Sequence, residues 1–228
     1  IAVYPSMNGD IAREIITPAT VQSFGGTILI DHYVRTPEQF AADIKAIPKK
    51  LNARIGLGEF GAPIPDLQGD MTQAEQAAYV DSLFKAMYLE RAHIPVVNYW
   101  TLNGGSTELI NHTGTPRAAY VTVQNYFKAF NVHGITYNSL GESIRGASVR
   151  VDGTEYSAVS DGTYQIFVPR HYGSVTIRAD GYLPVTLQMP SSATTTIVIR
   201  DVYLEPVSPD WWYKTRAYLY KKLQLQIR

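Results

Sequence analysis

The first part of the chain, up to about residue 130, alternates short apolar runs with segments of helical periodicity. The apolar runs are Ile1–Tyr4, Thr27–Val34, Ile55–Glu59 and Pro95–Trp100. Each run is nearly continuous in apolar character, which is typical of parallel strands that are covered on both faces. Because helical segments separate the runs, the pattern predicts βα units and a parallel sheet.

Capping signals mark where the helices of this part begin. Thr36-Pro37-Glu38-Gln39 supplies an N-cap, a proline at the first helical position and a capping-box glutamine. Thr72-Gln73-Ala74-Glu75 repeats the capping box, and Thr115-Pro116 opens a third helix. The residues expected on the inner faces of the second and third helices are Val80, Leu83, Phe84 and Met87, and Val123, Phe127 and Phe130.

From about Gly134 the apolar positions recur with a period of two, which indicates strands with one buried face. The alternating positions are Val149/Val151, Tyr164/Ile166/Val168, Val175/Ile177, Val185/Leu187 and Ile197/Ile199. Asp-Gly pairs at 152–153, 161–162 and 180–181 favour hairpin turns between them. This pattern predicts a small antiparallel β-sandwich of about 70 residues.

The change of period places a domain boundary near Asn131–Gly134. The expected fold class is therefore α/β plus all-β. We expect an α/β domain at residues 1–131, a β-sandwich at 134–206 and an aromatic, basic C-terminal tail at 207–228. The chain opens directly on a strand-like run, so we expect that either processing or missing sequence has removed what came before.

Composition excludes several classes of function. The 228-residue chain has 20 basic and 20 acidic residues, so it lacks the basic balance of a nucleic-acid-binding protein. It has no cysteine, which excludes disulfides and thiolate metal ligands. Its five histidines show no metal-ligand spacing, so no metal or other cofactor is expected. No apolar run in the sequence reaches the ~18 residues that a membrane span needs.

A glutamate interrupts the apolar, glycine-rich run Ile55–Pro63. An ionised carboxylate is costly to bury without a partner, so Glu59 is either a turn residue that reaches solvent or a catalytic group. The neighbouring strands end in Asp31-His32-Tyr33 and Asn98-Tyr99-Trp100. The carboxyl ends of parallel strands share one edge, which is the active-site end of a β/α barrel. A carboxylate, an aromatic floor and orienting polar groups are together typical of a sugar-binding site.

These segments resemble the closing half of the clan A glycoside hydrolases, which are retaining enzymes with a (β/α)8 TIM barrel. The matching segments are DHYV (31–34), GEFG (58–61), NYWTLNGG (98–105) and ELINHTGTPRAAYVTVQNYF (108–127). The resemblance implies strands five to eight of a barrel over about residues 1–130, with Glu59 as the catalytic nucleophile. It implies that Trp100 lies under the sugar and that Asn103 also binds substrate. His32 and Tyr33 would line the same site, with Tyr33 hydrogen-bonded to the nucleophile.

The resemblance also shows what this sequence lacks. The family's acid/base glutamate follows an asparagine at the end of strand four, and no Asn-Glu pair occurs here. A complete barrel needs about 250 residues, so an N-terminal half-barrel segment or chain is expected to carry the acid/base. The protein would then be an extracellular or cell-surface enzyme that hydrolyses β-linked oligo- or polysaccharides. The alternative is a non-catalytic glycan-binding or filament protein built on a degenerate barrel.

For His32 and Asp31, a structural role is an alternative to a role in the site. A histidine at a strand end is often a hydrogen-bonded structural residue, which applies to His32. Asp31 could serve as a second carboxylate, although we expect it to cap a helix or to form a salt bridge.

The all-β part resembles the carboxypeptidase-regulatory-like, transthyretin-like modules over residues 137–169 and 175–184. That resemblance implies a spacer or docking role without catalytic residues. In the tail, Trp211, Trp212 and Tyr213 could stack on glycan or pack between the domains. Together with the basic residues Lys214, Arg216, Lys221 and Lys222 they could instead lie at a membrane surface. Packing between the domains is the prediction, and membrane association ranks last.

Overall fold

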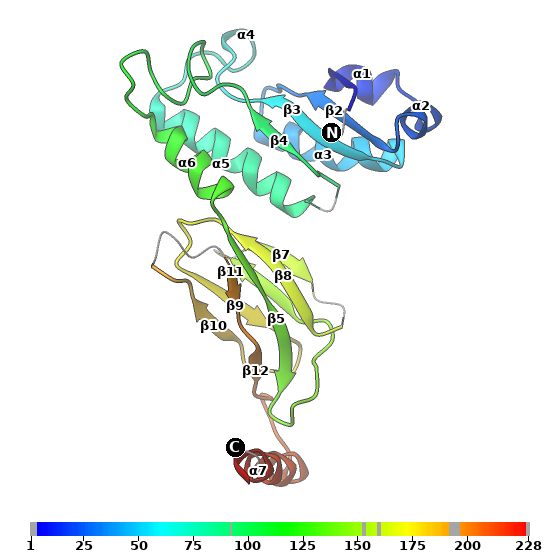
Figure 1. The fold of residues 1–228 in the computed structure, drawn as a ribbon, viewed down its shortest axis with the longest axis vertical. Helices are drawn as coiled ribbons and strands as arrows, with labels where there is room; N and C mark the ends of the chain where they lie inside the picture. Colours follow the sequence, from blue (N-terminus) through cyan, green and yellow to red (C-terminus); the bar gives the residue numbers. More distant parts are fainter. Residues whose placement is uncertain (1–3, 92, 152–153, 159–160, 192–196, 227–228) are drawn as a thin grey trace. The chain divides into compact units, whose positions relative to one another are not determined.

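The computed structural model describes residues 4–91, 93–151, 154–158, 161–191 and 197–226. The chain divides into two compact units, Ile1–Gln124 and Asn125–Arg228, which we call the α/β unit and the β unit and describe separately. Figure 1 shows the helices and strands of each. The protein is of mixed α/β composition with several sheets, and no sheet closes into a barrel among the described residues.

Four strands form the sheet of the α/β unit, in the order β1-β2-β3-β4. Their bounds are Ser6–Asn8 (β1), Thr27–Asp31 (β2), Arg54–Phe60 (β3) and Val97–Tyr99 (β4). Every neighbouring pair is parallel, as the alternation of strands and helices predicted. The first strand lies beyond the predicted run Ile1–Tyr4, of which residues 1–3 fall outside the described residues.

Six helices of this unit are described, and three of them are too short to show a helical period in the sequence. Their bounds are Gly9–Glu14 (α1), Pro18–Ser23 (α2), Pro37–Leu51 (α3), Pro65–Gln68 (α4), Gln73–Leu89 (α5) and Ala118–Phe127 (α6). The predicted capping box opens α5, because the Thr72 N–H donates to Glu75 Oε2 at 2.8 Å and the Glu75 N–H donates to Thr72 Oγ1 at 3.2 Å. The Thr36 hydroxyl caps α3 by accepting the Gln39 N–H at 3.2 Å, but the return bond from the Thr36 N–H to the Gln39 side chain is absent between these two described residues, so only the N-cap half of the predicted box forms.

Helix α6 differs from the prediction at both ends. Pro116 forms an isolated β-bridge with Ile110, so the helix begins at Ala118 instead of at the Thr-Pro pair. Phe127 is 55% exposed, so its predicted place on the inner face is wrong. Phe130 is buried, but it belongs to a strand and not to the helix.

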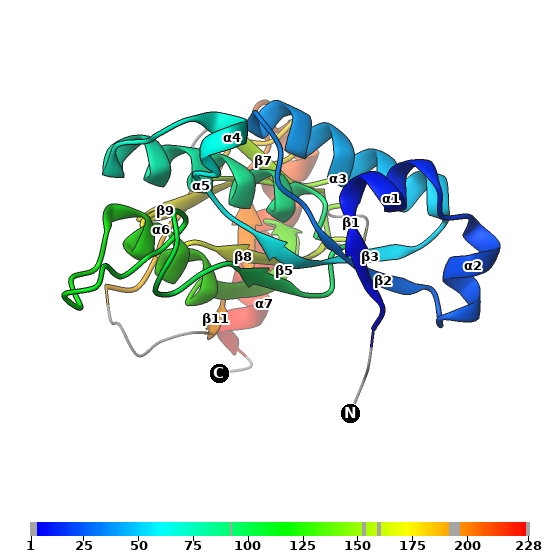
Figure 2. The same ribbon diagram turned by 90° about the horizontal axis from the view of Figure 1, so that it is seen from above.

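The core of the α/β unit lies between one face of the sheet and the helices α3 and α5, which pack against each other (Figure 2). The sheet residues that are fully buried here are Ile28, Ile30, Ile55 and Leu57. The Phe60 ring meets Phe84 and Tyr99 edge-on, with 5.5 Å between ring centroids in each pair. The predicted inner positions of α5, which are Val80, Leu83, Phe84 and Met87, are all buried.

The opposite face of this sheet consists of small, polar or partly exposed residues. A Cβ placed on Gly58 would lie 2.6 Å from Asp31 Oδ1 and 3.1 Å from Ser6 Oγ, so glycine lets these side chains approach the strand. Val96 is 41% exposed and Asn98 is exposed. Parallel sheets usually have both faces covered, and the described part of the chain leaves this face accessible.

Two sheets form the β unit. One has the strand order β10-β9-β6-β7, and in the other β5 pairs with β8, β11 and β12. Their bounds are Phe130–Asn138 (β5), Ser148–Val151 (β6), Thr154–Ala158 (β7), Thr163–Val168 (β8), Ser174–Arg178 (β9), Val185–Gln188 (β10), Ile197–Ile199 (β11) and Val202–Leu204 (β12). Strands β11 and β12 run parallel to β5, so the expectation of a wholly antiparallel unit is wrong for them. Strand direction depends on where the chain re-enters the sheet, which a period of two does not encode.

The Asp-Gly turns form where the structure describes them, but only the one at 180–181 joins a hairpin. Strands β9 and β10 pair with each other, whereas β7 and β8, on either side of Asp161-Gly162, belong to different sheets. Gly162 has a φ of 92°, and the Asp161 carboxylate accepts the Thr163 N–H at 2.9 Å. Gly181 has a φ of 80° in the turn between β9 and β10. The Asp-Gly pair at 152–153 lies outside the described residues.

The buried face of β11 is the reverse of the prediction. Ile197 and Ile199 are 58% and 64% exposed, whereas Val198 between them is 5% exposed. All three residues are apolar, so the sequence pattern could not show which face turns inward. A shift of one residue exchanges the two faces of a strand.

The β unit also begins earlier than the predicted boundary at 134. Phe130 and Val132 are buried in β5, and the Arg170 guanidinium carbon lies 4.0 Å from the Phe130 ring centroid. The Arg170 N–H donates to the Asn125 carbonyl at 3.1 Å. A final helix, α7, spans Trp211–Gln226 and forms the end of this unit.

Candidate active site

The carboxyl ends of β2, β3 and β4 lie along one edge of the parallel sheet. Asp31 and Glu59 are partners in the register of β2 and β3. The His32 N–H donates to the Glu59 carbonyl at 2.8 Å, and the Trp100 N–H donates to the Phe60 carbonyl at 3.0 Å. The three strand ends singled out in the sequence are therefore adjacent in space.

Glu59 is half-buried and hydrogen-bonded at this edge. The Tyr33 hydroxyl donates to Glu59 Oε2 at 3.2 Å. Burial, followed by the negative charges of Glu59 and Asp31, raises the pKa of Tyr33 well above its usual range. The phenol therefore stays protonated and keeps donating to the carboxylate, which fixes the orientation of Glu59.

Asp31 lies beside this pair without the contacts expected for it. Its Oδ1 accepts a hydrogen bond from the Ser6 hydroxyl at 3.1 Å. It neither caps a helix nor forms an ion pair among the described residues, so both expected structural roles are wrong. Gly58 permits this arrangement, because any larger side chain there would collide with the Asp31 carboxylate.

His32 does not face the accessible edge. Its imidazole is 4% exposed, and Nε2 lies 3.1 Å from Asp43 Oδ2 on α3. Its ring centroid is 5.6 Å from that of Phe40, and a Cβ on Gly9 would fall 2.1 Å from Nδ1. Burial lowers the pKa of His32, so the ring is neutral near pH 7. His32 therefore holds α3 and the start of α1 against the strand end, which corrects its assignment as a substrate-binding residue.

Trp100 presents an accessible aromatic surface. Its side chain is 51% exposed, although it lies one residue beyond the buried Tyr99. The Trp100–Thr101 peptide bond is cis. A Cβ on Gly61 would lie 2.3 Å from the Trp100 carbonyl, so the backbones of the two strand ends are in close contact. The indole is thus carried on a closely packed backbone while its ring remains available to a ligand.

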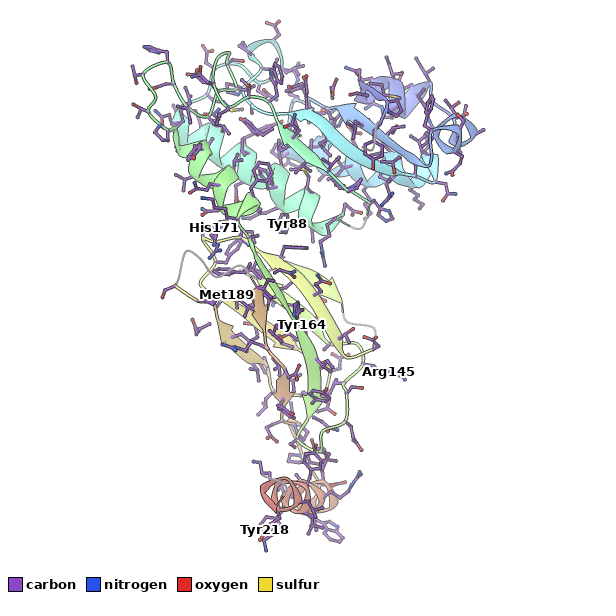
Figure 3. All side chains as sticks on the ribbon, in the orientation of Figure 1. Tyr88, Arg145, Tyr164, His171, Met189 and Tyr218 are labelled. Carbon is purple, nitrogen blue, oxygen red and sulfur yellow. The ribbon has the colours of Figure 1, made fainter. Side chains whose placement is uncertain are left out.

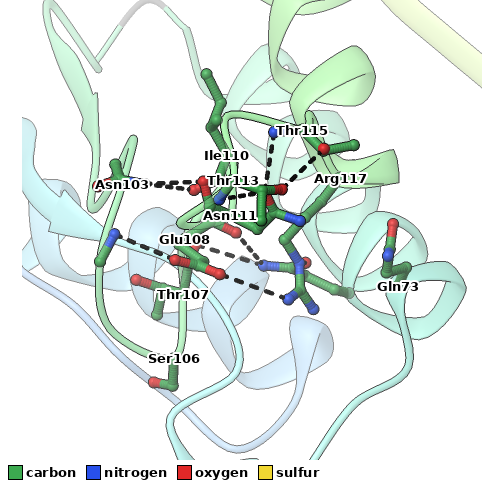
Figure 4. Close-up of polar contacts among 12 residues, drawn as sticks. Gln73, Asn103, Ser106, Thr107, Glu108, Ile110, Asn111, Thr113, Thr115 and Arg117 are labelled. Carbon is green, nitrogen blue, oxygen red and sulfur yellow. Dashed lines mark hydrogen bonds and ion pairs between the residues drawn. The ribbon is translucent and has the colours of Figure 1, made fainter.

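Asn103 belongs to the loop that follows β4, shown in Figure 4. Its amide Nδ2 donates to the carbonyl oxygens of Ile110 and Asn111, at 2.9 and 3.2 Å. Glu108 supports the same loop, because its Oε2 accepts the Gly104 N–H at 3.2 Å. The amide hydrogens of Asn103 are used to close the loop, so the structure gives this residue a loop-ordering role, and its predicted contact with substrate stays a prediction.

The sequence analysis missed a buried glutamine that fixes this region. Gln76 on α5 is fully buried, and its Nε2 donates to the carbonyl oxygens of Ala62, Thr107 and Glu108 at 2.8 to 3.4 Å. Its Oε1 accepts from Arg117 Nε at 2.8 Å. One polar residue thus ties the segment after β3 to the loop after β4. A signal was present, because Gln76 lies on the same side of α5 as the apolar positions Val80 and Leu83.

Among the described residues, no group of three or more histidine, aspartate or glutamate side chains is placed to hold a metal ion. The chemistry available at the edge is that of an oriented carboxylate beside an exposed indole, with a second carboxylate, Asp31, nearby.

No protein-family model and no curated protein matches the chain. Among solved structures, it is similar to a GH39 β-xylosidase from Caulobacter crescentus, with 9% identity over 81% of this chain and 37% of that chain and a TM-score of 0.37. It is also similar to a protein of unknown function and inferred membrane association from Bacteroides fragilis NCTC 9343, with 19% identity over 36% of this chain and 29% of that chain and a TM-score of 0.27. The chain spans less than half of either structure, and these two distant likenesses do not assign it to a family.

Proposed function

We propose that this chain carries the nucleophile side of a retaining glycoside hydrolase that acts on β-linked glycans. The observation that carries the proposal is the hydrogen bond from Tyr33 to Glu59 at the carboxyl edge of the parallel sheet, with the exposed Trp100 on the neighbouring strand end. A carboxylate at that edge is positioned as catalytic groups of β/α barrels are.

Each residue has a distinct role in this proposal. One oxygen of Glu59 attacks the anomeric carbon, and the bond between that carbon and the leaving oxygen breaks, which yields a glycosyl-enzyme ester. Tyr33 holds Oε2, so the other oxygen is aimed at the sugar. Trp100 supplies an apolar platform for the ring of the sugar that is cleaved. Water then releases the sugar from Glu59.

The proposal needs a second carboxyl group about 5–5.5 Å from Glu59, as retention requires. We assign the α/β unit to strands five to eight of a (β/α)8 barrel and the acid/base to a further half-barrel segment. Two features support this assignment. Strands β1 and β4 each have one unpaired edge among the described strands. The sheet face that carries Gly58 is accessible, with Val96 beside it 41% exposed, whereas parallel sheets usually have both faces covered. The β unit is then a spacer sandwich, and the enzyme works outside the cell on polymeric sugars.

A slow substrate with an activated leaving group tests the nucleophile directly. A 2-deoxy-2-fluoro-β-glycoside of dinitrophenol needs no general acid, because dinitrophenolate leaves without a proton, and the fluorine slows hydrolysis of the ester. Incubation of the 228-residue chain with glucosyl, xylosyl and mannosyl versions should add one sugar mass on the peptide that contains Glu59. Glu59→Gln should remove the label.

The same experiment separates the alternative function. Saturable binding of a β-linked oligosaccharide by the chain and by its extended form with a preceding half-barrel, with no covalent label on either, would favour a non-catalytic glycan-binding protein. A label on any residue other than Glu59 would refute the assignment of the nucleophile.

A further inference from the structure

Helix α7 has one side held against the β unit. The Tyr213 hydroxyl lies 2.9 Å from Ser139 Oγ and accepts the Ser139 N–H at 3.2 Å. Arg216 pairs with Glu142 at 3.1 Å, and the Asp210 carboxylate caps the helix by accepting the Tyr213 N–H at 2.6 Å. The contacts of Tyr213 and Arg216 with Ser139 and Glu142 lie on one side of the helix and fix which of its residues face solvent.

The solvent side of α7 carries large apolar side chains. The exposed fractions are 67% for Trp211, 60% for Tyr218, 52% for Leu219 and 60% for Leu223. Figure 3 shows Tyr218 pointing away from the strands of the β unit. Trp211 and Tyr218, seven residues apart, form one row on the outer half of the helix. Leu219 and Leu223, four residues apart, form a second row about 100° around the helix from the first. Exposed apolar groups gathered in this way mark a surface that contacts something other than water.

The same helix is a local concentration of positive charge in a neutral chain. Lys214, Arg216, Lys221 and Lys222 lie on it, and no acidic residue occurs from 211 to 228. Glu142 neutralises Arg216, which leaves three lysines to supply the charge. Lys222 Nζ lies 5.5 Å from the centroid of the Tyr218 ring, so cation and aromatic side chains share one surface.

We propose that the outward side of α7 docks the protein on an anionic lipid bilayer, with the helix lying in the plane of the headgroups. Tryptophan and tyrosine rings settle at the headgroup level, leucines enter the acyl boundary, and lysines meet the lipid phosphates. A soluble polyanion would match the lysines but would leave the leucines and Trp211 in water. Charge and apolar area together therefore select a bilayer, independently of the glycosidase proposal.

This contact is peripheral. None of the helices in the described part of the chain has the length and apolar character needed to cross a membrane. Docking through α7 would attach the protein to the surface through its β unit.

Sedimentation with vesicles tests the proposal on the 228-residue protein. Vesicles of phosphatidylcholine with about one third phosphatidylglycerol should carry the protein down, and phosphatidylcholine alone should not. The triple change Lys214→Gln, Lys221→Gln and Lys222→Gln should lower the partition coefficient by roughly 100-fold, since each lysine near an anionic surface contributes about fivefold. Raising the salt from 0.1 to 0.5 M should weaken binding of the unchanged protein, which requires no variant to fold.

Two controls separate docking from a general charge effect. The matched triple Lys45→Gln, Lys49→Gln and Lys128→Gln removes the same charge from exposed positions outside α7 and should bind as tightly as the unchanged protein. Trp211→Ala keeps the charge and should weaken binding by about tenfold, because an interfacial aromatic anchor is lost. Circular dichroism of each variant checks that α7 is retained.

Three results would overturn the proposal. The first is no sedimentation of the unchanged protein at low salt. The second is an equal loss for both lysine triples. The third is a loss with the α7 triple but none with Trp211→Ala, because a purely electrostatic contact does not insert the apolar side chains and would equally fit a soluble polyanion.

Discussion

The start of the β unit yields a quantitative prediction, because structure and sequence pattern place it differently. Removing residues 125–133 from the segment 125–228 gives the segment 134–228, which begins at the predicted boundary. The shorter segment lacks the part of β5 from Phe130 to His133, which pairs with β8 and with all of β11. It also lacks the main-chain contact between Asn125 and Arg170.

The magnitude follows from burial. Phe130 is 2% exposed and Val132 is fully buried. Burying one such side chain contributes about 1.5–3 kcal/mol, so their loss costs about 3–6 kcal/mol before the strand pairing is counted. Domains of this size have a total stability of about 5–15 kcal/mol. The segment 134–228 should therefore be largely unfolded at 37 °C, whereas 125–228 should melt cooperatively.

Urea denaturation followed by far-UV circular dichroism measures the difference. Single variants in 125–228 test which side chains of β5 face the core. Val132→Ala should lower the free energy of unfolding by about 2 kcal/mol. Asn131→Ala should cost less than about 1 kcal/mol, because that side chain is partly exposed and shares one 3.3 Å hydrogen bond with Gln165. A segment 134–228 that unfolds cooperatively within about 1 kcal/mol of 125–228 would refute the reasoning.

Three further predictions concern the α/β unit. Under the proposed function, Glu59→Gln in the chain joined to its half-barrel segment should abolish turnover while oligosaccharide binding and the melting temperature stay near wild type. Near-normal hydrolysis rates would exclude Glu59 as the nucleophile. Trp100→Ala should weaken oligosaccharide binding by about 1–3 kcal/mol in calorimetry; unchanged affinity with a large drop in melting temperature would make Trp100 a core residue. Because the pKa of His32 is lowered in the native state, the unfolded state takes up a proton at a higher pH than the native state does. The free energy of unfolding should therefore fall as the pH drops below about 6.5. His32→Asn should flatten this part of the curve of unfolding free energy against pH, and an unchanged slope would show that other groups are responsible.

The sequence by itself determined the elements whose signals are local. The capping box at Thr72 acts over one helical turn, and the Asp180-Gly181 turn over a few residues, so both are formed as the residues predict. The parallel sheet followed from the alternation of apolar runs and helices. Placing Glu59 and Trp100 at the same edge required only the rule that parallel strands end together.

Only the tertiary structure decided the contacts that join distant segments. The sequence shows that His32 ends a strand, but the buried partner Asp43 and the close approach of Gly9 turn its ring into the core. Asn103 closes its own loop because the carbonyls of Ile110 and Asn111 come within reach after the chain turns back. In each case the orientation of the side chain depends on a hydrogen-bond partner that the local sequence pattern cannot reveal.

The β unit and α7 show the same limit. Ile197, Val198 and Ile199 are equally apolar, so the pairing with β5 alone decided that Val198 is buried. In α7 the sequence shows aromatic and basic residues, but the contacts of Tyr213 and Arg216 with the turn after β5 decide which of them face outward. Composition states which interactions are possible, and the long-range packing of the chain selects the side on which they occur.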